Sequence, residues 1–216
     1  MQQDFFVSVI VPVFNSQKYI GRCLRSLKNQ SLGKRNYEVM VINDYSNDNS
    51  LKEILKQKTS NIKIINNKKK MGLPASLNIG ITAAKGSFVV RVDSDDWVHP
   101  DFLNILSTFL YINKNMDAVA CDYSLVDKKE ILIREANCEN NPIGCAIMFR
   151  MQHLLEINLY DEKFTYSEEE ALRNEFLKKY KITRVPVSLY RYRQHENNRS
   201  KNKEKVRKFS KKINKS

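Results

Sequence analysis

The chain has few of the residues that characterise disulfide-rich, fibrous or membrane-spanning proteins. Its 216 residues include 6 glycines, 5 prolines and 4 cysteines, and no stretch approaches the roughly 18 uninterrupted apolar residues of a spanning helix. The cysteines form no C-x-x-C pair, which argues against a zinc site or a disulfide framework, and we expect them to be reduced and buried. The first residues lack the basic and apolar regions of a signal peptide, which predicts a cytoplasmic protein.

Acidic residues are scarce relative to basic ones, 24 against 37, so the net charge is +13. Residues 199–216 hold nine Lys and Arg against one Glu, which accounts for +8 of this excess. A nucleic-acid-binding module would need basic residues interleaved with aromatic ones, which this tail supplies poorly, so no nucleic-acid partner is expected. Within residues 201–216, apolar Val206, Phe209 and Ile213 form one stripe of a basic helix, which predicts binding to an anionic membrane surface, peripheral at the inner face of the cell membrane. A solvated, disordered tail is the alternative.

The composition is otherwise that of a globular protein, with 42% apolar and 10% aromatic residues. A chain of this length can bury roughly 70% of its unfolded surface. Neither an internal repeat nor a long linker divides it. We expect a single domain over residues 1–200, followed by the basic tail at 201–216.

Strand and helix patterns alternate along the first part of the chain. Residues 7–13 form an apolar, β-branched run typical of a strand covered on both faces, and Pro12 should end its pairing. An apolar stripe from 19 to 27 then predicts a helix. The pattern continues with strands at 38–42, 62–65, 87–92 and 118–122 and helices at 50–57, 74–84 and 101–112, with Leu51, Ile54 and Leu55 inward on the first of these helices. This order predicts an α/β fold with an open, mostly parallel sheet and helices on both faces.

Ligands of such sheets bind beyond the carboxyl ends of the strands, which directs attention to the loops after Val13, Ile42 and Val92. The last loop begins with Asp93, Ser94, Asp95 and Asp96. Clustered carboxylates repel one another unless a cation lies among them, and Mg²⁺ or Mn²⁺ is the usual solution. On this interpretation Asp95 coordinates the metal and Asp93 holds a ribose or a metal-bound water. The alternative is a solvated turn in which Asp96 or Ser94 caps the next helix.

The loop after Ile42 is a second polar turn at a strand end. Asp44 could accept a hydrogen bond from a base-edge N–H and so select a nucleobase. The alternative is an Asx-turn followed by a helix cap at Asp48 or Asn49.

Three motifs in this order resemble family 2 glycosyltransferases of the GT-A fold, a Rossmann-like fold. They are V-S-V-I-V-P-V-F-N at 7–15, N-D-Y-S-N-D-N-S at 43–50 and D-S-D-D at 93–96. The resemblance continues through residues 71–80 and 192–195 and covers residues 7–200. It implies a nucleotide-binding half at 1–123 and an acceptor half at 124–200.

The resemblance also implies an activity and a set of site residues. The family transfers a sugar, with inversion, from a nucleoside diphosphate sugar that is usually UDP-linked. The acceptor would be a saccharide or a lipid-linked hydroxyl, in surface polysaccharide or glycan assembly. The corresponding donor-binding residues are Pro12, Phe14, Asn15, Asp44, Asn78 and Asp93, and those near the metal, Mn²⁺ or Mg²⁺, are Asp93, Asp95 and His195. The chain departs from the pattern at Asn43, where an acid is usual, and at Tyr45 and Asn49, where glycines are usual.

The family places a catalytic base in a Glu-Asp pair, and the matching stretch here has Glu168 in the first place and Glu169 in the second. We identify Glu169 as the candidate base, with Glu168 beside it. The alternative is structural: Ser167 and Glu170 form an S-x-x-E capping box for a helix near 167–180, whose N-terminus favours negative charge, and we assign Glu170 to this cap.

Other segments leave alternatives open. Residues 144–150 resemble the acceptor-side segment of the family but are also compatible with a buried strand. His99 and His153 have no site context and are expected to be surface or cap residues. A nucleotidyltransferase would share the sheet and the carboxylates but normally carries a Gly-rich phosphate loop near the first strand, which is absent between Val13 and Ser16. A non-catalytic nucleotide-sugar-binding protein is a further alternative.

Overall fold

A computed structural model describes residues 6–196 together with residues 198, 204, 207, 209, 210 and 213. Most of the basic side chains of the predicted tail helix, and Val206 of its apolar stripe, lie outside the described residues.

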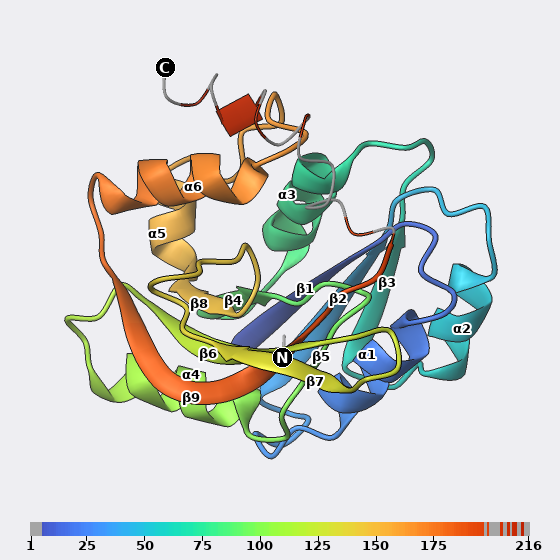
Figure 1. Cartoon of the computed structure of the whole chain (residues 1–216), viewed down its shortest axis with the longest axis horizontal. Coiled ribbons are helices and arrows are strands. Elements are labelled where there is room, and N and C mark those ends of the chain that lie inside the picture. The colour runs from blue at the N-terminus through green and yellow to red at the C-terminus, as the bar shows by residue number, and fades with distance from the viewer. Residues whose placement is uncertain are drawn as a thin grey trace.

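Helices and strands alternate through the first part of the chain, as predicted (Figure 1). The elements in chain order are β1 (Val7–Val13), α1 (Ile20–Lys28), β2 (Tyr37–Asn43), α2 (Ser50–Lys56), β3 (Ile62–Asn66), α3 (Leu73–Ala83), β4 (Phe88–Arg91), β5 (Trp97–Val98), α4 (Phe102–Ile112), β6 (Ala118–Val126), β7 (Leu132–Ala136), β8 (Ile147–Arg150), α5 (Met151–Glu156), α6 (Glu168–Leu177) and β9 (Ile182–Arg193). In the described part of the chain, no helix is both long and apolar enough to cross a membrane.

Nine strands of the described chain form one sheet in the order β3-β2-β1-β4-β8-β6-β9-β5, with β7 paired to β6. The pairs β3-β2, β2-β1, β1-β4 and β6-β9 are parallel. β8 is antiparallel to both β4 and β6, which lie on either side of it. The open, mostly parallel sheet is confirmed. The interpretation of 144–150 as a buried strand is confirmed for its second part, since β8 begins at Ile147 and lies at the centre of the sheet.

The prediction that Pro12 ends strand pairing is wrong for one neighbour. β1 pairs with β2 through Val13, whereas its pairing with β4 stops at Ile10. The carbonyl of Val13 accepts from Asp44 N of the loop after β2, and the carbonyl of Ile10 accepts from Val92 N of the loop after β4. Backbone groups alternate sides along a strand, so the missing N–H of Pro12 faces the β4 side, where pairing has already ended.

The core is divided by the sheet into two layers. Val9 and Val11 of β1 pack in the cluster that contains Leu24 of α1, and Ile10, between them, packs in the other cluster with Leu77 of α3. Figure 1 shows the corresponding arrangement, with α3, α5 and α6 over one face and α1 and α4 over the other. Helices on both faces are therefore confirmed, and all four cysteines are buried as expected.

One side chain of α2 was assigned to the wrong face. Ile54 is fully buried as predicted, but Leu55 is 53% exposed. Adjacent helix positions are about 100° apart, and this seven-residue helix has only one covered stripe, so burying Ile54 leaves Leu55 outward.

Candidate active site

The loops after β1, β2 and β4 meet at the carboxyl edge of the sheet, as predicted. Ser16 Oγ lies 2.7 Å from Ser94 Oγ, which joins the first loop to the third. Asn15 joins the first loop to the second, because its backbone N–H donates to Ser46 Oγ at 3.1 Å and its Oδ1 accepts from Asn47 N at 3.0 Å. The polar residues chosen from three separate stretches of sequence therefore line one surface.

Each aspartate of the loop after β4 has a separate partner within the protein. Both oxygens of Asp93 accept from Arg91, at 2.6 and 3.1 Å. Asp95 Oδ2 lies 2.7 Å from His195 Nε2. The predicted cluster of carboxylates is thus compensated partly by side chains from β4 and from the segment after β9.

The third aspartate is internal. Asp96 is 2% exposed and accepts from Tyr190 Oη and from Arg193 N, each at 2.7 Å. Burial raises the pKa of Asp96 well above its ordinary value, and the charges of Asp95 and Asp93 add to the effect. The alternative in which Asp96 or Ser94 caps the next helix is wrong, since these side chains bond β9 and Ser16 instead.

The residues predicted to lie near a metal differ in accessibility. Asp93, Asp96 and Cys145 bring potential ligand atoms within 4.8 Å of one another, but Asp96 and Cys145 are buried, and burial raises the pKa of the Cys145 thiol. Asp95 and His195 are 24% and 10% exposed, so both can be reached from outside. Their carboxylate oxygen and imidazole nitrogen suit Mn²⁺, and the histidine ring is held by stacking on Tyr19 at 4.8 Å. The donor set therefore fits a divalent ion better at Asp95 and His195 than at the buried group.

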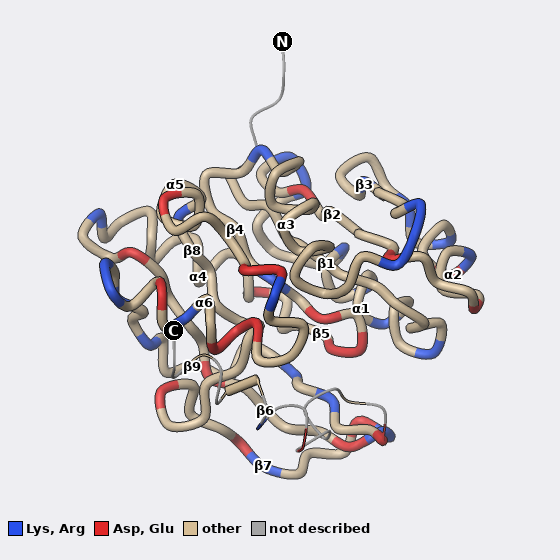
Figure 2. The backbone as a smooth tube through the Cα atoms, turned by 90° about the horizontal axis from the view of Figure 1, so that it is seen from above, with Lys and Arg blue, Asp and Glu red and all other residues tan. Residues whose placement is uncertain are grey.

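Glu168 and Glu169 begin α6 and lie close to the β4 loop through Arg91. Arg91 Nη1 donates to Glu168 Oε1 at 3.1 Å, so a single guanidinium contacts both Asp93 and Glu168. In Figure 2 acidic stretches of the chain lie close together in the middle of the molecule, between β4, β5 and α6. The aspartate loop and the carboxylate pair are 75 residues apart in sequence, and the fold joins them.

Glu169 has an environment suited to proton transfer. Burial, followed by the charge of Glu168, raises its pKa to about 7, against the lowering effect of Arg91. Gly144, before β8, lies against this side chain: a Cβ at that position would come within 2.7 Å of Glu169 Cβ. The close approach of α6 therefore requires a residue without a side chain at this position.

The capping box predicted for Ser167 and Glu170 is wrong. Ser167 precedes α6, but its φ of 59° lies in the left-handed region and its side chain makes no capping bond. Capping requires extended backbone at this position, and Ser167 Oγ instead lies 3.3 Å from Ser210 Oγ. Glu170 accepts from the same Ser210 hydroxyl at 2.5 Å.

The residues predicted to bind a donor nucleotide are only partly free to do so. Asp44 is 4% exposed and already accepts hydrogen bonds from Asn67 Nδ2, Met71 N and Gly72 N. A carboxylate can accept about four hydrogen bonds, so it has room for one further donor. Pro12 is buried within β1, and Phe14 is 42% exposed with Lys70 Nζ 3.5 Å from its ring centre.

Asn78 lies apart from this group. Its side-chain amide donates to Tyr160 O at 2.9 Å and accepts from Tyr160 N at 3.0 Å, which ties α3 to the segment before α6. Donor binding by Asn78 stays a prediction.

The isolated histidines have structural surroundings. His99 Nδ1 accepts from Asp101 N at 3.2 Å just before α4, as expected of a cap residue. His153 stacks on Tyr180 with ring centres 4.1 Å apart.

Several residues of the site were not predicted. Arg91 contacts two of the carboxylates, and Tyr190 Oη accepts from Asp93 N at 3.1 Å while it donates to Asp96. Arg193 Nε donates to the carbonyl of Asp95 at 2.9 Å. The available signal for Arg91 was a charged residue inside an otherwise apolar strand, but the sequence did not reveal its partners.

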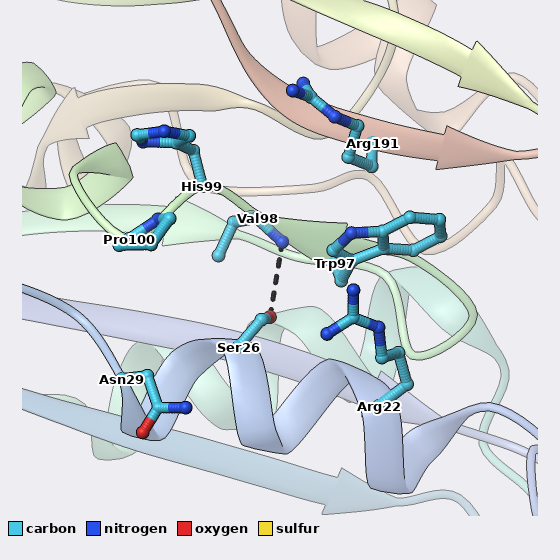
Figure 3. A pocket seen from close by; sticks show the side chains of 8 residues that line it. All are labelled: Arg22, Ser26, Asn29, Trp97, Val98, His99, Pro100 and Arg191. Carbon is cyan, nitrogen blue, oxygen red and sulfur yellow. Dashed lines mark hydrogen bonds between the residues drawn. The ribbon is translucent and has the colours of Figure 1, made fainter. Parts of the chain in front are cut away.

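A cavity of about 270 Å³ lies beside this site, between α1, β5 and β9 (Figure 3). Trp97, which directly follows Asp96, forms part of its wall, and the guanidinium carbon of Arg22 lies 5.0 Å from the centre of the indole ring. The lining residues are Arg22, Ser26, Asn29, Trp97, Val98, His99, Pro100 and Arg191. None of the predicted site residues lines it.

Known proteins share this sequence pattern and fold. The family model described as Glycosyl transferase family 2 matches residues 8–214. An uncharacterized glycosyltransferase of Haemophilus influenzae is 28% identical over 224 residues, which cover 93% of this chain and 69% of that protein. The poly(ribitol-phosphate) beta-N-acetylglucosaminyltransferase TarS of Staphylococcus aureus is 37% identical over 105 residues, 48% of this chain and 18% of that protein.

Solved structures confirm the GT-A fold. TarS residues 1–349 in complex with UDP-GlcNAc superpose with a TM-score of 0.81 at 23% identity, over 97% of this chain and 65% of that one. The mannosyltransferase PcManGT of Pyrobaculum calidifontis, in complex with GDP-Man and Mn²⁺, superposes with a TM-score of 0.72 at 16% identity, over 89% and 58% of the two chains. The chain spans 69% of the Haemophilus protein, 18% of TarS and 15% of the glycosyltransferase GlyA of Streptococcus pneumoniae.

The family model covers nearly all of the chain and describes glycosyltransferases, so the nucleotidyltransferase alternative has no support. The chain belongs to glycosyl transferase family 2.

Proposed function

We propose that this chain is a metal-dependent, inverting glycosyltransferase that moves a sugar from a UDP-linked donor to a saccharide or lipid-linked acceptor hydroxyl in polysaccharide assembly. The observation that carries the proposal is the bridge through Arg91, which holds Asp93 and the Glu168–Glu169 pair in one cluster. Donor-side and base-side carboxylates must lie close together for a direct displacement. TarS, with its UDP-GlcNAc complex and its polymer acceptor, supports the choice of donor and acceptor classes.

Glu169 has the properties that the base of such a displacement requires. The acceptor oxygen attacks the anomeric carbon, the acceptor proton passes to the Glu169 carboxylate, and the bond from that carbon to the diphosphate breaks with inversion. A pKa of about 7 places proton uptake near neutral pH, where a base is most effective. The rate should therefore rise with pH as Glu169 ionises, and level off above about 7.

On the donor side, Asp95 and His195 would hold Mn²⁺ or Mg²⁺ together with the diphosphate oxygens, with Asp93 beside them. PcManGT, with Mn²⁺ in its complex, supports the choice of a divalent ion. When bound, the ion would supply positive charge against the negative charge of the leaving diphosphate. Two residues of β9 hold these aspartates in place for the donor. Arg193 donates to the backbone carbonyl of Asp95, and the backbone N–H of Asp93 donates to the hydroxyl of Tyr190.

Calorimetric titration of UDP-sugars with and without Mn²⁺, followed by transfer assays of two variants, tests the proposal. Glu169→Gln should lower transfer about 10²–10⁴-fold while donor affinity stays unchanged, because a positioned base contributes that much and does not contact the nucleotide. Asp95→Asn should instead weaken metal-dependent donor binding.

The matched control is Glu170→Gln, which changes the next carboxylate along α6, one bonded to Ser210. Its transfer rate should stay close to that of the unaltered chain. Near-native turnover by Glu169→Gln would contradict the base assignment. Donor binding without transfer by the unaltered chain would favour a non-catalytic nucleotide-sugar-binding protein.

A further inference from the structure

Arg91 is a largely buried cation at the end of the central strand β4. Its side chain is 10% exposed, and the residues before it, Val89 and Val90, belong to the two apolar cores. Removing a guanidinium from water is costly unless charged partners satisfy it. The carboxylates of Asp93 and Glu168 do so, and although burial alone would lower the pKa of Arg91, their charges raise it above its ordinary value.

The geometry of the guanidinium fixes two elements at once. Nε and Nη2 bond the two oxygens of Asp93, and such a forked pair sets the rotation of the carboxylate as well as its distance. Nη1 bonds Glu168, the first residue of α6, whose side chain is 5% exposed. The backbone of Glu169 follows directly, so the position of the candidate base depends on where Arg91 holds its neighbour.

The same contact adjusts the charge around Glu169. Among the charged side chains that act on its carboxyl, Glu168 and Asp93 raise the pKa and Arg91 lowers it. Arg173 also interacts electrostatically with Glu169. Arg173, one turn further along α6, lies against the same small cavity as Glu169. Arg91 is the cation that lies between the donor-side aspartate and the base pair.

We infer that Arg91 is a positioning residue that sets the distance and orientation between the donor-side carboxylate Asp93 and the base Glu169. This role rests on the proposed function, since it assigns Glu169 as the base. Lysine cannot replace it, because a single ammonium cannot hold both oxygens of Asp93 and also reach Glu168.

Arg91→Lys tests this role while it keeps the charge. The expected result is a fall in kcat of about 10²-fold, larger than any rise in donor KM, because small misplacements of reacting groups have effects of this size. The pH at which kcat levels off should move above about 7, since the positive charge is displaced from Glu169. Glu168→Gln should move it in the opposite direction by removing the like charge, and serves as the second variant where Arg91→Lys does not fold.

Arg150 offers a matched control on the neighbouring strand. It is a partly buried arginine at the end of β8, but within the described part of the chain its guanidinium bonds only backbone carbonyls, those of Met116, Leu110 and Asn113. Arg150→Lys should lower the melting temperature as Arg91→Lys does and leave kcat and its pH dependence unchanged.

A measurement without turnover separates this inference from the proposed function. Carbon-13 NMR titration of the Glu169 carboxyl in the metal-free protein should give a pKa near 7, higher in Arg91→Lys, lower in Glu168→Gln and unchanged in Arg150→Lys. If the unaltered chain transfers no sugar, the proposed function fails and this titration still decides the role of Arg91. Equal kcat and equal Glu169 pKa in Arg91→Lys and Arg150→Lys would overturn the inference.

Discussion

At the scale of single residues, the carboxylate of Asp44 is held by three donors from the segment between β3 and α3. Asp44 was expected to be open to a nucleobase, because a polar turn after an apolar strand is visible in sequence. Most of its capacity is taken by Asn67 and by the backbone N–H groups of Met71 and Gly72. Backbone donors carry no sequence signature, so such a partner can be found only from the structure.

Gly72 has a backbone conformation that residues with a side chain rarely adopt, so its substitution should be destabilising. Its φ of 91° and ψ of 167° lie in a region that is essentially restricted to glycine. An added Cβ would meet nothing within 4 Å, so Gly72→Ala isolates backbone strain. We expect it to lower the free energy of unfolding by about 1–3 kcal/mol in urea denaturation. Gly21→Ala, the same change inside α1, should raise it by up to about 1 kcal/mol, and equal effects of the two would refute the strain argument.

At the scale of elements, periodicity revealed the βα units and failed for the later strands. β1, β2 and β4 are largely apolar and buried runs, and α1, between the first two, has one apolar stripe, so these elements could be read locally. β9 carries exposed Pro186 and Val187 next to buried Leu189 and Tyr190, a pattern without clean alternation. β8 lies antiparallel between β4 and β6, and a four-residue strand gives no sign of its neighbours or its direction.

Glu38 shows how one side chain joins several elements of the sheet. It is fully buried on β2 and accepts from Ser8 Oγ of β1 at 2.8 Å, Lys63 Nζ of β3 at 2.7 Å and Lys85 N, before β4, at 2.6 Å. Glu38→Ala takes the acceptor from the Ser8 hydroxyl and from the buried N–H of Lys85, removes the ion pair with Lys63, and should lower the free energy of unfolding by about 1–3 kcal/mol in urea denaturation. Glu53→Ala, which removes an exposed helical pair with Lys56, should cost less than about 0.5 kcal/mol. Similar losses in both variants would argue against the role given to Glu38.

At the scale of the whole molecule, the sequence predicts a single domain over residues 1–200 followed by a basic tail, and the structure places two residues of that tail, Phe209 and Ser210, against residues at the start of α6 and just before it. The ring of Phe209 lies 5.9 Å from that of Tyr166, and Ser210 bonds Glu170 at the start of α6. One member of the apolar stripe predicted to face a membrane thus packs against Tyr166, in the segment that leads into α6. Its positive charge is therefore the property that we expect to attract this segment to an anionic membrane surface.

Residues 201–216 should bind anionic vesicles through that charge. Each basic residue near such a surface contributes about 1 kcal/mol, and salt screens the attraction over about 8 Å at physiological ionic strength. The unaltered chain should therefore co-sediment with vesicles that contain acidic lipid at low salt, dissociate from them at high salt, and ignore vesicles of neutral lipid. A chain ending at residue 200 should remain unbound in each case.

Phe209 is packed on Tyr166, so we expect the attraction to come from charge and not from insertion of the apolar stripe. Binding by insertion would persist at high salt, whereas binding by charge alone would not. Equal binding by the full and shortened chains would end the membrane hypothesis.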